Sequence, residues 1–288
     1  MTEEIAIRRA ETVADYLACQ EAQRRAWGIT DESYVVPLAT MIGAQLHGGL
    51  VLGAFAPDGR ALGLSFAFLG KVEGRPCLYS QLTGVVPGQQ GRGLGGRLKA
   101  AQREFARAEG LPCLAWAFDP LQAGNARFNL DRLGATAARF IPDMYGRRTD
   151  ALNADVATDR LIAEWSTGPD PGPRPDPGDG SGLARLIDVR ELAEGILAPV
   201  ANLDPISAGR TALLEIPADI ASIRKDRPGL ADDWARAVRR AFVDAFALGY
   251  RAEGFMRGGS TGPTRSYYVL RCPDPAPAPA LPPIDRAD

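Results

Sequence analysis

The sequence predicts a mixed α/β fold, with a large first part and a smaller α/β lobe after it. Strand-like and helix-like patterns alternate over residues 5–166, as expected for a sheet covered by helices. A glycine-rich turn at residues 90–95 stands between an apolar strand-like run and a run with helical spacing. Residues 167–182 consist almost entirely of Pro, Gly, Asp and Ser, a composition that cannot support a core.

The first part is expected to contain seven strands and four helices. Thr12 is a suitable N-cap for the first helix, and Pro57-Asp58-Gly59 is a turn signal between the second and third strands. Gly110 and Gly134 follow the last two helices, where a left-handed residue commonly ends a helix. The strands are expected at residues 5–9, 50–55, 61–69, 77–86, 114–118, 137–141 and 160–165, and the helices at residues 13–27, 35–46, 94–108 and 125–133.

The second part is expected to be a smaller lobe of four strands and one amphipathic helix. Trp234, Val238 and Phe242 share one face of that helix. The order of strand, proline, loop, helix, glycine and strand repeats that of the first part; it fits a degenerate internal duplication and equally the order of any βαβ unit. The strands are expected at residues 183–189, 212–216, 250–257 and 266–271, and the helix at 232–248. The domains are expected at residues 1–166, 167–182 (a Pro/Gly linker), 183–272 and 273–288 (a disordered Pro-rich tail).

Composition argues against several classes of protein. The net charge of −2 gives no basic field for nucleic acid. No run approaches the 18 apolar residues of a membrane span, and the first nine residues have no apolar signal region, so a cytoplasmic protein is expected. Cysteines 19, 77, 113 and 272 lack metal-binding or redox spacing; we expect reduced thiols and no metal.

The glycine-rich turn is the most informative segment. A strand, a glycine-rich turn and a helix N-terminus together direct several backbone N–H groups toward one point, which suits a pyrophosphate. The plain alternative is a tight strand-to-helix turn. A Walker A loop is excluded, because no Gly-Lys-Ser/Thr follows.

A longer pattern surrounds this turn: Val85-x-Pro87-x-x-Gln90-Gly91-Arg92-Gly93-Leu94-Gly95-x-x-Leu98. It resembles the acyl-CoA-binding signature of the GNAT superfamily of N-acetyltransferases, in which Gln or Arg opens a run Q/R-x-x-G-x-G/A. The resemblance covers about residues 3–166 and is most specific at 82–98. It implies an acyl-CoA N-acyltransferase (GNAT-like) fold, here in a little-described two-lobed branch, with acetyl-CoA or another acyl-CoA as co-substrate and a small-molecule amine as acceptor.

The resemblance also implies a binding site for the CoA arm. Backbone N–H groups hold the pyrophosphate, with Arg92 and Arg97 as charge partners or as plain surface charge. The strand before the turn diverges from its neighbour and pairs with the pantetheine amides, and a backbone N–H there stabilises the oxyanion. Asn125 matches an asparagine that bonds the CoA arm, or else caps its helix. The implied CoA-binding residues are Val85, Val86, Gln90, Gly91, Arg92, Gly93, Leu94, Gly95, Gly96 and Asn125. The corresponding loop of the second part, residues 218–230, lacks the glycine run and is not expected to hold CoA.

Catalytic residues are less well defined. An amine of pKa near 10.4 costs about 4.6 kcal/mol to deprotonate at pH 7, and Asp119 is the candidate base, with a turn role before Pro120 as the alternative. Many GNAT enzymes carry a tyrosine four residues before the glycine that closes the helix after the fifth strand; here that position is Leu130. Tyr145 is the candidate replacement for that acid.

Tyr79 is the third catalytic candidate, because it is expected to share a strand face with Gln81, Thr83 and Val85. His47 has an adequate explanation as a residue at a helix end, and Glu73 is a further carboxylate near the predicted groove.

The leading hypothesis is an N-acyltransferase that transfers an acetyl or succinyl group by direct attack of the acceptor amine, with an amino acid among the candidate acceptors. Neither Cys77 nor Cys113 has a histidine partner suggested by the sequence, which disfavours a covalent thiol intermediate. The alternatives are an acyl-CoA sensor without turnover and a protein N-acetyltransferase whose second lobe docks a partner. The second lobe would otherwise cover the acceptor side or form a homodimer interface.

Overall fold

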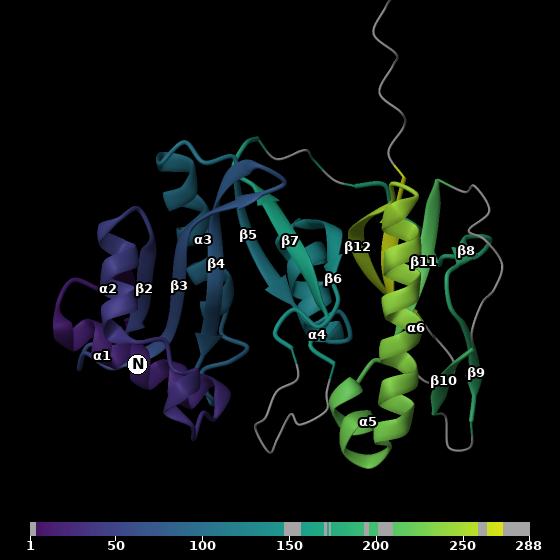
Figure 1. Cartoon of the computed structure of the whole chain (residues 1–288), viewed down its shortest axis with the longest axis horizontal. Coiled ribbons are helices and arrows are strands. Elements are labelled where there is room, and N and C mark those ends of the chain that lie inside the picture. Colours follow the sequence, from purple (N-terminus) through teal and green to yellow (C-terminus); the bar gives the residue numbers. More distant parts are fainter. Residues whose placement is uncertain are drawn as a thin grey trace, which may run out of the picture.

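The computed structural model describes residues 4–146, 157–169, 172, 174–192, 196–200, 210–258 and 264–272. An eleven-stranded sheet runs through both lobes, in the order β1-β2-β3-β4-β5-β7-β6-β12-β13-β11-β8, and β9 and β10 form a separate pair. The predicted fold class, α/β with a mixed sheet, is confirmed (Figure 1). The predicted tail at residues 273–288 lies outside the described residues.

The first lobe has the order of elements that the resemblance implies. In chain order it contains β1 (Ala6–Arg9), α1 (Val13–Trp27), the 3-10 turn η1 (Glu32–Tyr34), α2 (Leu38–Leu46), β2 (Leu50–Phe55), β3 (Ala61–Val72), β4 (Arg75–Val85), α3 (Leu94–Ala108), β5 (Cys113–Phe118), α4 (Ala123–Ala126), the π-helical turn η2 (Arg127–Arg132), β6 (Thr136–Ile141) and β7 (Arg160–Ser166).

Local signals explain most of these bounds. The N–H of Asp15 donates to Thr12 Oγ1 at 3.2 Å, and the Asp15 carboxylate accepts from the Thr12 N–H at 3.1 Å, which is a complete capping box. The start predicted for α2, residue 35, is wrong because Pro37 occupies the N-cap position. The helix predicted at 125–133 begins earlier, at Ala123, and continues as the π-helical turn.

The second lobe contains β8 (Ala184–Arg185), β9 (Asp188–Glu191), β10 (Leu197–Val200), β11 (Thr211–Ile216), α5 (Ile220–Asp226), α6 (Pro228–Ala247), β12 (Arg251–Gly258) and β13 (Arg265–Arg271). The single strand predicted at 183–189 is wrong: β8 pairs with β11 and β9 pairs with β10, so the chain changes partner between them. α5 and β10 were not predicted. α6 begins at Pro228, since proline suits the first position of a helix.

The two lobes meet at the edge of β6. One pair of residues, Ala137 and Ala252, joins β6 to β12, and the rings of Phe140 and Phe242 stack beside it at 5.8 Å between centroids. β13 lies between β11 and β12, whereas β4 and β5 are direct neighbours. The similar element order of the two βαβ segments therefore does not extend to strand order, and the internal duplication stays a prediction.

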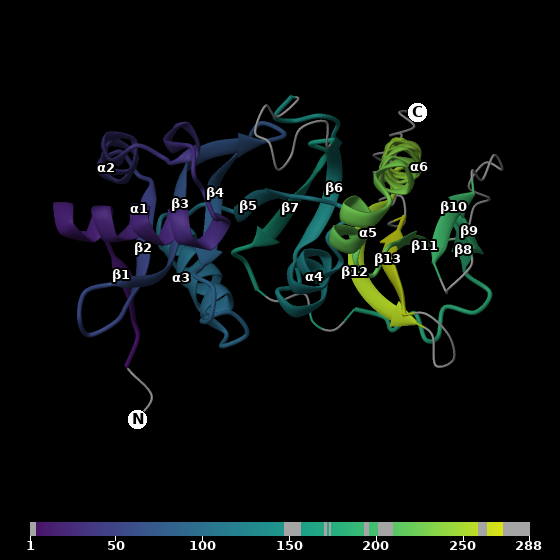
Figure 2. The ribbon, with the colours of Figure 1, turned by 90° about the horizontal axis from the view of Figure 1, so that it is seen from below.

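Helices cover both faces of the first lobe's sheet (Figure 2). A Cβ on Gly84 would meet the ring of Trp27 on α1, whereas a Cβ on Gly63 would meet Leu98 on α3. Because Gly63 pairs with Val85 and Leu64 with Gly84, neighbouring residues of β4 point alternately toward α3 and toward α1. Among the helices that the structure describes, none combines the length and apolar composition that crossing a membrane would need.

Candidate functional site

The N-terminus of α3 is open to a ligand. Gly93 is its N-cap, in the left-handed conformation at φ 78°, and no side chain caps the helix. The first turn contains no acidic residue. The N–H groups of Leu94, Gly95 and Gly96 precede the first intrahelical bond, from Arg97 N–H to Gly93 O. These N–H groups and the preceding turn form the cradle (residues 90–96), whose partial positive charge favours an anion.

Side chains of the turn stabilise the cradle from outside. Gln90 Nε2 donates to Val85 O at 3.3 Å, and Arg92 Nη1 donates to Gln89 Oε1 at 3.1 Å. Arg92 is exposed beside the cradle and remains a charge partner for an anion. Arg97 instead donates to Ile5 O at 3.1 Å, so it links α3 to the start of the chain.

The strand that leads into the cradle separates from its parallel neighbour. β4 pairs with β5 only at Leu78–Leu114 and Tyr79–Ala115. Gln81 is an extra residue in the pairing of β4 with β3, and such a bulge increases local twist. Residues 80–85 of β4 therefore have no partner on β5. We call this opening the fork; its closed end is at Tyr79 and its open end at the cradle. The divergence implied by the resemblance is present.

The fork gives Val85 and Val86 different surroundings. The N–H of Val86 donates to Leu62 O on the β3 side at 3.0 Å. Because N–H groups alternate along a strand, the N–H of Val85 points into the fork, where a pantetheine amide would pair. The backbone N–H of Val86 has a partner already, so the structure does not direct it into the fork.

The bulge also changes which side chains share a face. The expectation that Tyr79 shares a face with Thr83 and Val85 is wrong, because the extra residue Gln81 shifts the alternation. Thr83 Oγ1 lies 3.4 Å from Ser80 Oγ, on the α3 face. Tyr79 lies on the opposite face, its ring centroid 5.4 Å from that of Phe68.

Two predicted catalytic residues meet on that opposite face, at the closed end of the fork. The Tyr79 hydroxyl is buried; it forms no hydrogen bond of ordinary geometry in the part of the chain that the structure describes, and the Tyr145 phenol is the acceptor nearest to it in effect. Burial raises the pKa of Tyr79 to about 12, and the nearby Tyr145 phenol adds to the rise. Tyr145 is 46% exposed and packs against the Arg160 guanidinium. Tyr79 therefore stays protonated at neutral pH and can donate a proton.

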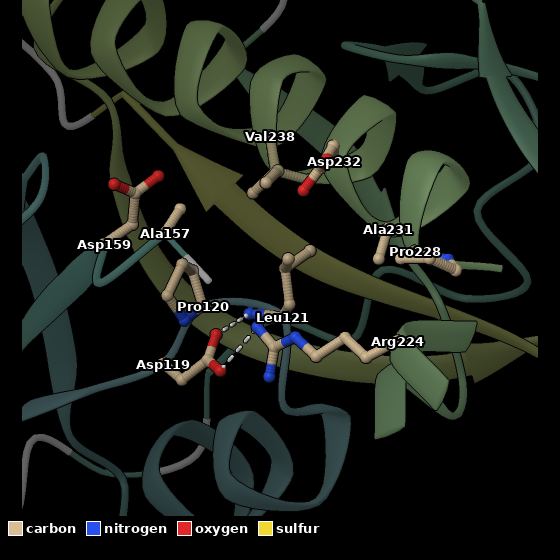
Figure 3. A pocket seen from close by; sticks show the side chains of 11 residues that line it. Asp119, Pro120, Leu121, Ala157, Asp159, Arg224, Pro228, Ala231, Asp232 and Val238 are labelled. Carbon is tan, nitrogen blue, oxygen red and sulfur yellow. Dashed lines mark hydrogen bonds and ion pairs between the residues drawn. The ribbon is translucent and has the colours of Figure 1, made fainter. Parts of the chain in front are cut away.

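Asp119 lies elsewhere. Its Oδ1 accepts from the Leu121 N–H at 2.9 Å, and its Oδ2 pairs with Arg224 of α5 at 3.0 Å. Figure 3 shows this pair at the wall of a cavity of about 130 Å³ between β5 and the helices of the second lobe. Four residues of strand, about 13 Å, separate Asp119 from Ala115 at the closed end of the fork. The structure thus gives Asp119 the turn role and an ion pair between the lobes, and does not bring it to Tyr79.

The predicted elements beside the cradle are only partly as expected. A Cβ on Gly96 would lie 3.9 Å from the Phe128 ring, so η2 borders the cradle. Asn125 is exposed inside α4, and Gln122 is the N-cap; the alternative that Asn125 caps the helix is wrong. Leu130, at the position where the resemblance implies a tyrosine, is 1% exposed in the π-helical turn.

A pocket of about 550 Å³ opens next to Tyr79 on the α1 face. It is bounded by η1, the start of α2, and strands β3 and β4. Phe68 belongs to its wall and also contacts the Tyr79 ring, so the pocket adjoins the closed end of the fork. Among the residues that the structure describes, none that lines it is charged: Ser33, Tyr34, Val35, Val36, Pro37, Thr40, Ala44, Phe66, Phe68 and Gln81. The sequence alone did not indicate this pocket, because its walls come from segments far apart in the chain.

The remaining candidates do not join the site. His47 is exposed at the C-terminal end of α2, and Glu73 lies in the turn between β3 and β4 with φ 50°. Cys77 and Cys113 are buried neighbours, and the pKa of Cys77 is raised by its hydrogen bond to Cys113 and by burial. The same hydrogen bond lowers the pKa of Cys113, so only Cys77 is made a poorer nucleophile by this pairing.

Glycines 91, 93 and 96 also match the G-x-G-x-x-G spacing of a dinucleotide-binding turn. The sheet argues against that function. Dinucleotides bind at the carboxyl ends of a mostly parallel sheet, whereas here β4–β5 and β8–β11 are the parallel pairs among the described strands, and the others are antiparallel.

No protein-family model and no curated protein matches the chain. Solved structures are similar to part of this chain. The protein yncA of Salmonella typhimurium, solved with its cofactor acetyl-CoA, is 23% identical; the match covers 60% of this chain and 99% of that one, with a TM-score of 0.46. An N-acetyltransferase of Staphylococcus aureus Mu50 is 17% identical over 57% of this chain and 99% of that one, with a TM-score of 0.45.

A GNAT-family acetyltransferase of Brucella melitensis, in complex with acetyl-CoA, is 19% identical. That match covers 60% of this chain and 94% of the other, with a TM-score of 0.39. At these identities and TM-scores, the function has to be argued from the site itself.

Proposed function

We propose that the chain is an acyl-CoA-dependent N-acyltransferase of the GNAT type. The observation that carries this proposal is the continuity of the cradle with the fork. One segment, β4–turn–α3, presents an uncapped helix N-terminus for a pyrophosphate and, directly beside it, an unpaired strand edge for amide groups. A CoA thioester contains both groups in that order along its arm. A simple strand-to-helix turn would require neither the fork nor the open edge.

The donor would lie with its pyrophosphate at the cradle and its thioester at the closed end of the fork. Val85 N–H faces the fork and would bind an amide carbonyl of the arm. The acceptor amine attacks the thioester carbon, a C–N bond forms, and the C–S bond breaks with loss of the thiolate. Tyr79 is the proposed proton donor to that thiolate, since its buried hydroxyl stays protonated at neutral pH and lies at the closed end of the fork.

Amine activation needs no neighbouring carboxylate in this scheme. Within the described part of the chain, no charged residue lines the pocket beside Tyr79, and an apolar environment disfavours the ammonium form of an amine and lowers its pKa. Each pKa unit removes about 1.4 kcal/mol from the cost of deprotonation. Water could then take the proton as the amine leaves bulk solvent and enters the pocket.

The donor is proposed to carry an acetyl or succinyl group, and the acceptor to be a small-molecule amine. The uncharged pocket favours an amine with an apolar or aromatic body, and it offers no cation to a carboxylate. An amino acid remains a candidate if its carboxylate points out of the pocket toward Arg160, which lies beside Tyr145.

A titration and a turnover assay test the proposal. Calorimetry should show binding of CoA, acetyl-CoA or succinyl-CoA, and thiol release should then depend on an added amine. The panel should contain each apolar amine together with the amino acid that has the same side chain plus a carboxylate, in both enantiomers. Failure of every CoA ester to bind would refute the proposal.

A second candidate is an acyl-CoA sensor without turnover, which Leu130 favours because it replaces the usual phenol. Binding without amine-dependent thiol release, from small amines and from peptides alike, would support the sensor. Release with peptides alone would support a protein N-acetyltransferase.

A further inference from the structure

A buried amine lies at the closed end of the fork, on the α3 face. Lys99 of α3 is 5% exposed. Its Nζ donates to Ser80 Oγ at 2.9 Å and lies 3.9 Å from the ring centroid of Trp116 on β5. Ser80 in turn donates to Gln102 Oε1 at 2.9 Å. The amine thus contacts both strands of the fork.

This amine has no compensating charge. Within the described part of the chain, Lys99 forms no ion pair, and burial lowers its pKa well below the usual lysine value. A buried charge without a partner costs several kcal/mol. The Trp116 ring attracts a desolvated ammonium by about 2 kcal/mol or more, which offsets only part of that cost. Burial therefore shifts the equilibrium of Lys99 toward the neutral amine.

The presence of lysine, and not arginine, at position 99 also favours an amine that can become neutral. Only three of the 33 Lys and Arg residues in the sequence are lysines, at positions 71, 99 and 225. Arginine cannot lose its charge in a protein, whereas a buried lysine can become a neutral nucleophile. Lys71 and Lys225 are exposed. In a chain that uses arginine almost everywhere, the one buried basic side chain at the fork is the type that can become neutral.

The position of Ser80 places this nucleophile next to the proposed thioester. Tyr79 is the last residue of β4 that pairs with β5, and Ser80 is the first beyond it. Lys99 Nζ is hydrogen-bonded to Ser80 Oγ, so it lies where β4 and β5 begin to separate. A donor arm that enters from the cradle brings its thioester to this end, and a neutral amine at that end is itself an acyl acceptor.

We propose that Lys99 is a self-acylation site of the protein, and this rests on the proposed binding of acyl-CoA in the fork. The Lys99 Nζ attacks the thioester carbon, a C–N bond forms, and the C–S bond breaks. The thiolate takes the proton that the nitrogen loses, so acyl-CoA and Lys99 yield an acyl-lysine amide and CoA thiol. The amide is stable to water, so each chain is modified once.

The experiment follows the three lysines of the full-length chain. The protein is incubated at neutral pH with acetyl-CoA or with succinyl-CoA, without an added amine, and analysed by intact mass and by peptide mapping. At pH 7 only about 1 in 2,500 molecules of an exposed lysine is neutral. We therefore expect Lys99 to be acylated at least about tenfold faster than Lys71 or Lys225. Lys99→Met should abolish the label at this position and leave acyl-CoA binding measurable.

The outcomes separate the inference from the function on which it rests. Calorimetric binding of a CoA ester with Lys99 unlabelled, or labelled no faster than Lys71, would overturn self-acylation and leave the acyltransferase proposal standing. Absence of binding for every CoA ester would refute both. If Lys99→Met fails to fold, the peptide map of the unaltered chain still decides, because the three lysines lie in separate peptides.

Discussion

Gly95 allows the fold and the ligand site to be tested with effects of opposite sign. It is the second residue of α3, its φ is not left-handed, and a Cβ there would meet only Val85 Cγ2 at 3.9 Å. Glycine in a helix is less favourable than leucine by up to about 0.8 kcal/mol. Gly95→Leu should therefore raise the free energy of unfolding by up to that amount, or the melting temperature by roughly 2 °C.

The same change should damage the cradle. Phosphate oxygens must come within about 3 Å of the first N–H groups of α3. The leucine side chain would occupy space beside Val85, at the open end of the fork. Loss of one charge-assisted hydrogen bond costs about 1.5–3 kcal/mol. We expect acetyl-CoA to bind at least about 30-fold more weakly, which corresponds to about 2 kcal/mol, as measured by calorimetry.

Gly229 provides a matched control. It is likewise the second residue of a helix, α6, a Cβ there would meet no atom within 4 Å, and it lies in the other lobe. Gly229→Leu should stabilise the chain similarly and leave binding unchanged. Gly95→Ala should keep most of the affinity, because the signature that the turn resembles accepts alanine there. Equal affinity of Gly95→Leu and the unaltered chain would refute the assignment of the cradle.

Other parts of the structure give three further predictions. Tyr79→Phe should slow amine-dependent thiol release at least about tenfold. The raised pKa of Tyr79 adds stability that is fully present below about pH 10 and is lost as pH rises through about 12. Between about pH 9 and about pH 11, this variant should therefore lose less free energy of unfolding in urea than the unaltered chain. Arg239→Met should cost about 3 kcal/mol in urea unfolding, since it leaves the Asp159 carboxylate, 7% exposed, without its cation; a loss below about 1 kcal/mol would contradict this. Cys77→Ala with Cys113→Ala should retain thiol release, and its disappearance in a folded double variant would revive a covalent thiol intermediate.

The elements with local signals were predictable from the sequence. α1 has a capping box at Thr12, and the turn at residues 57–59 separates β2 from β3 as expected. The run from Gln90 to Leu98 predicted the strand–turn–helix unit that forms the cradle. These features depend on neighbours within a few residues, so the sequence contains the information directly.

Features that depend on distant partners were not predictable in this way. The bulge at Gln81 arises from the pairing of β4 with β3, and it moves Thr83 to the face opposite Tyr79. The ion pair of Asp119 with Arg224 joins residues more than a hundred positions apart. From the sequence alone, Asp119 was a plausible base. In the structure, its carboxylate is paired with Arg224 and lies away from the closed end of the fork, where the thioester is proposed to lie.

The burial of Lys99 on α3 was likewise not predictable from local sequence. The apolar spacing of Leu94, Leu98, Ala101 and Phe105 predicted the helix but placed its buried face too far to one side, because Lys99 and Gln102 turn out to be buried. A signal was present in the rarity of lysine in the chain. This signal could be interpreted only once the structure placed Ser80 and Trp116 around the amine.

The placement of unsatisfied polar groups argues that the fork is a functional site and not a defect of the sheet. Three buried side-chain atoms without a hydrogen-bond partner in the described part of the chain flank β4: Ser65 Oγ, Tyr79 Oη and Gln102 Nε2. Each costs about 1–3 kcal/mol when left unpaired. A sheet optimised for stability alone would close β4 onto β5 and place apolar side chains here. A ligand with several amide and carbonyl groups along the fork would offer partners to the groups that face it, whereas Ser65 lies on β3, across β4 from the fork. The cost therefore lies where a CoA thioester would recover part of it as binding energy.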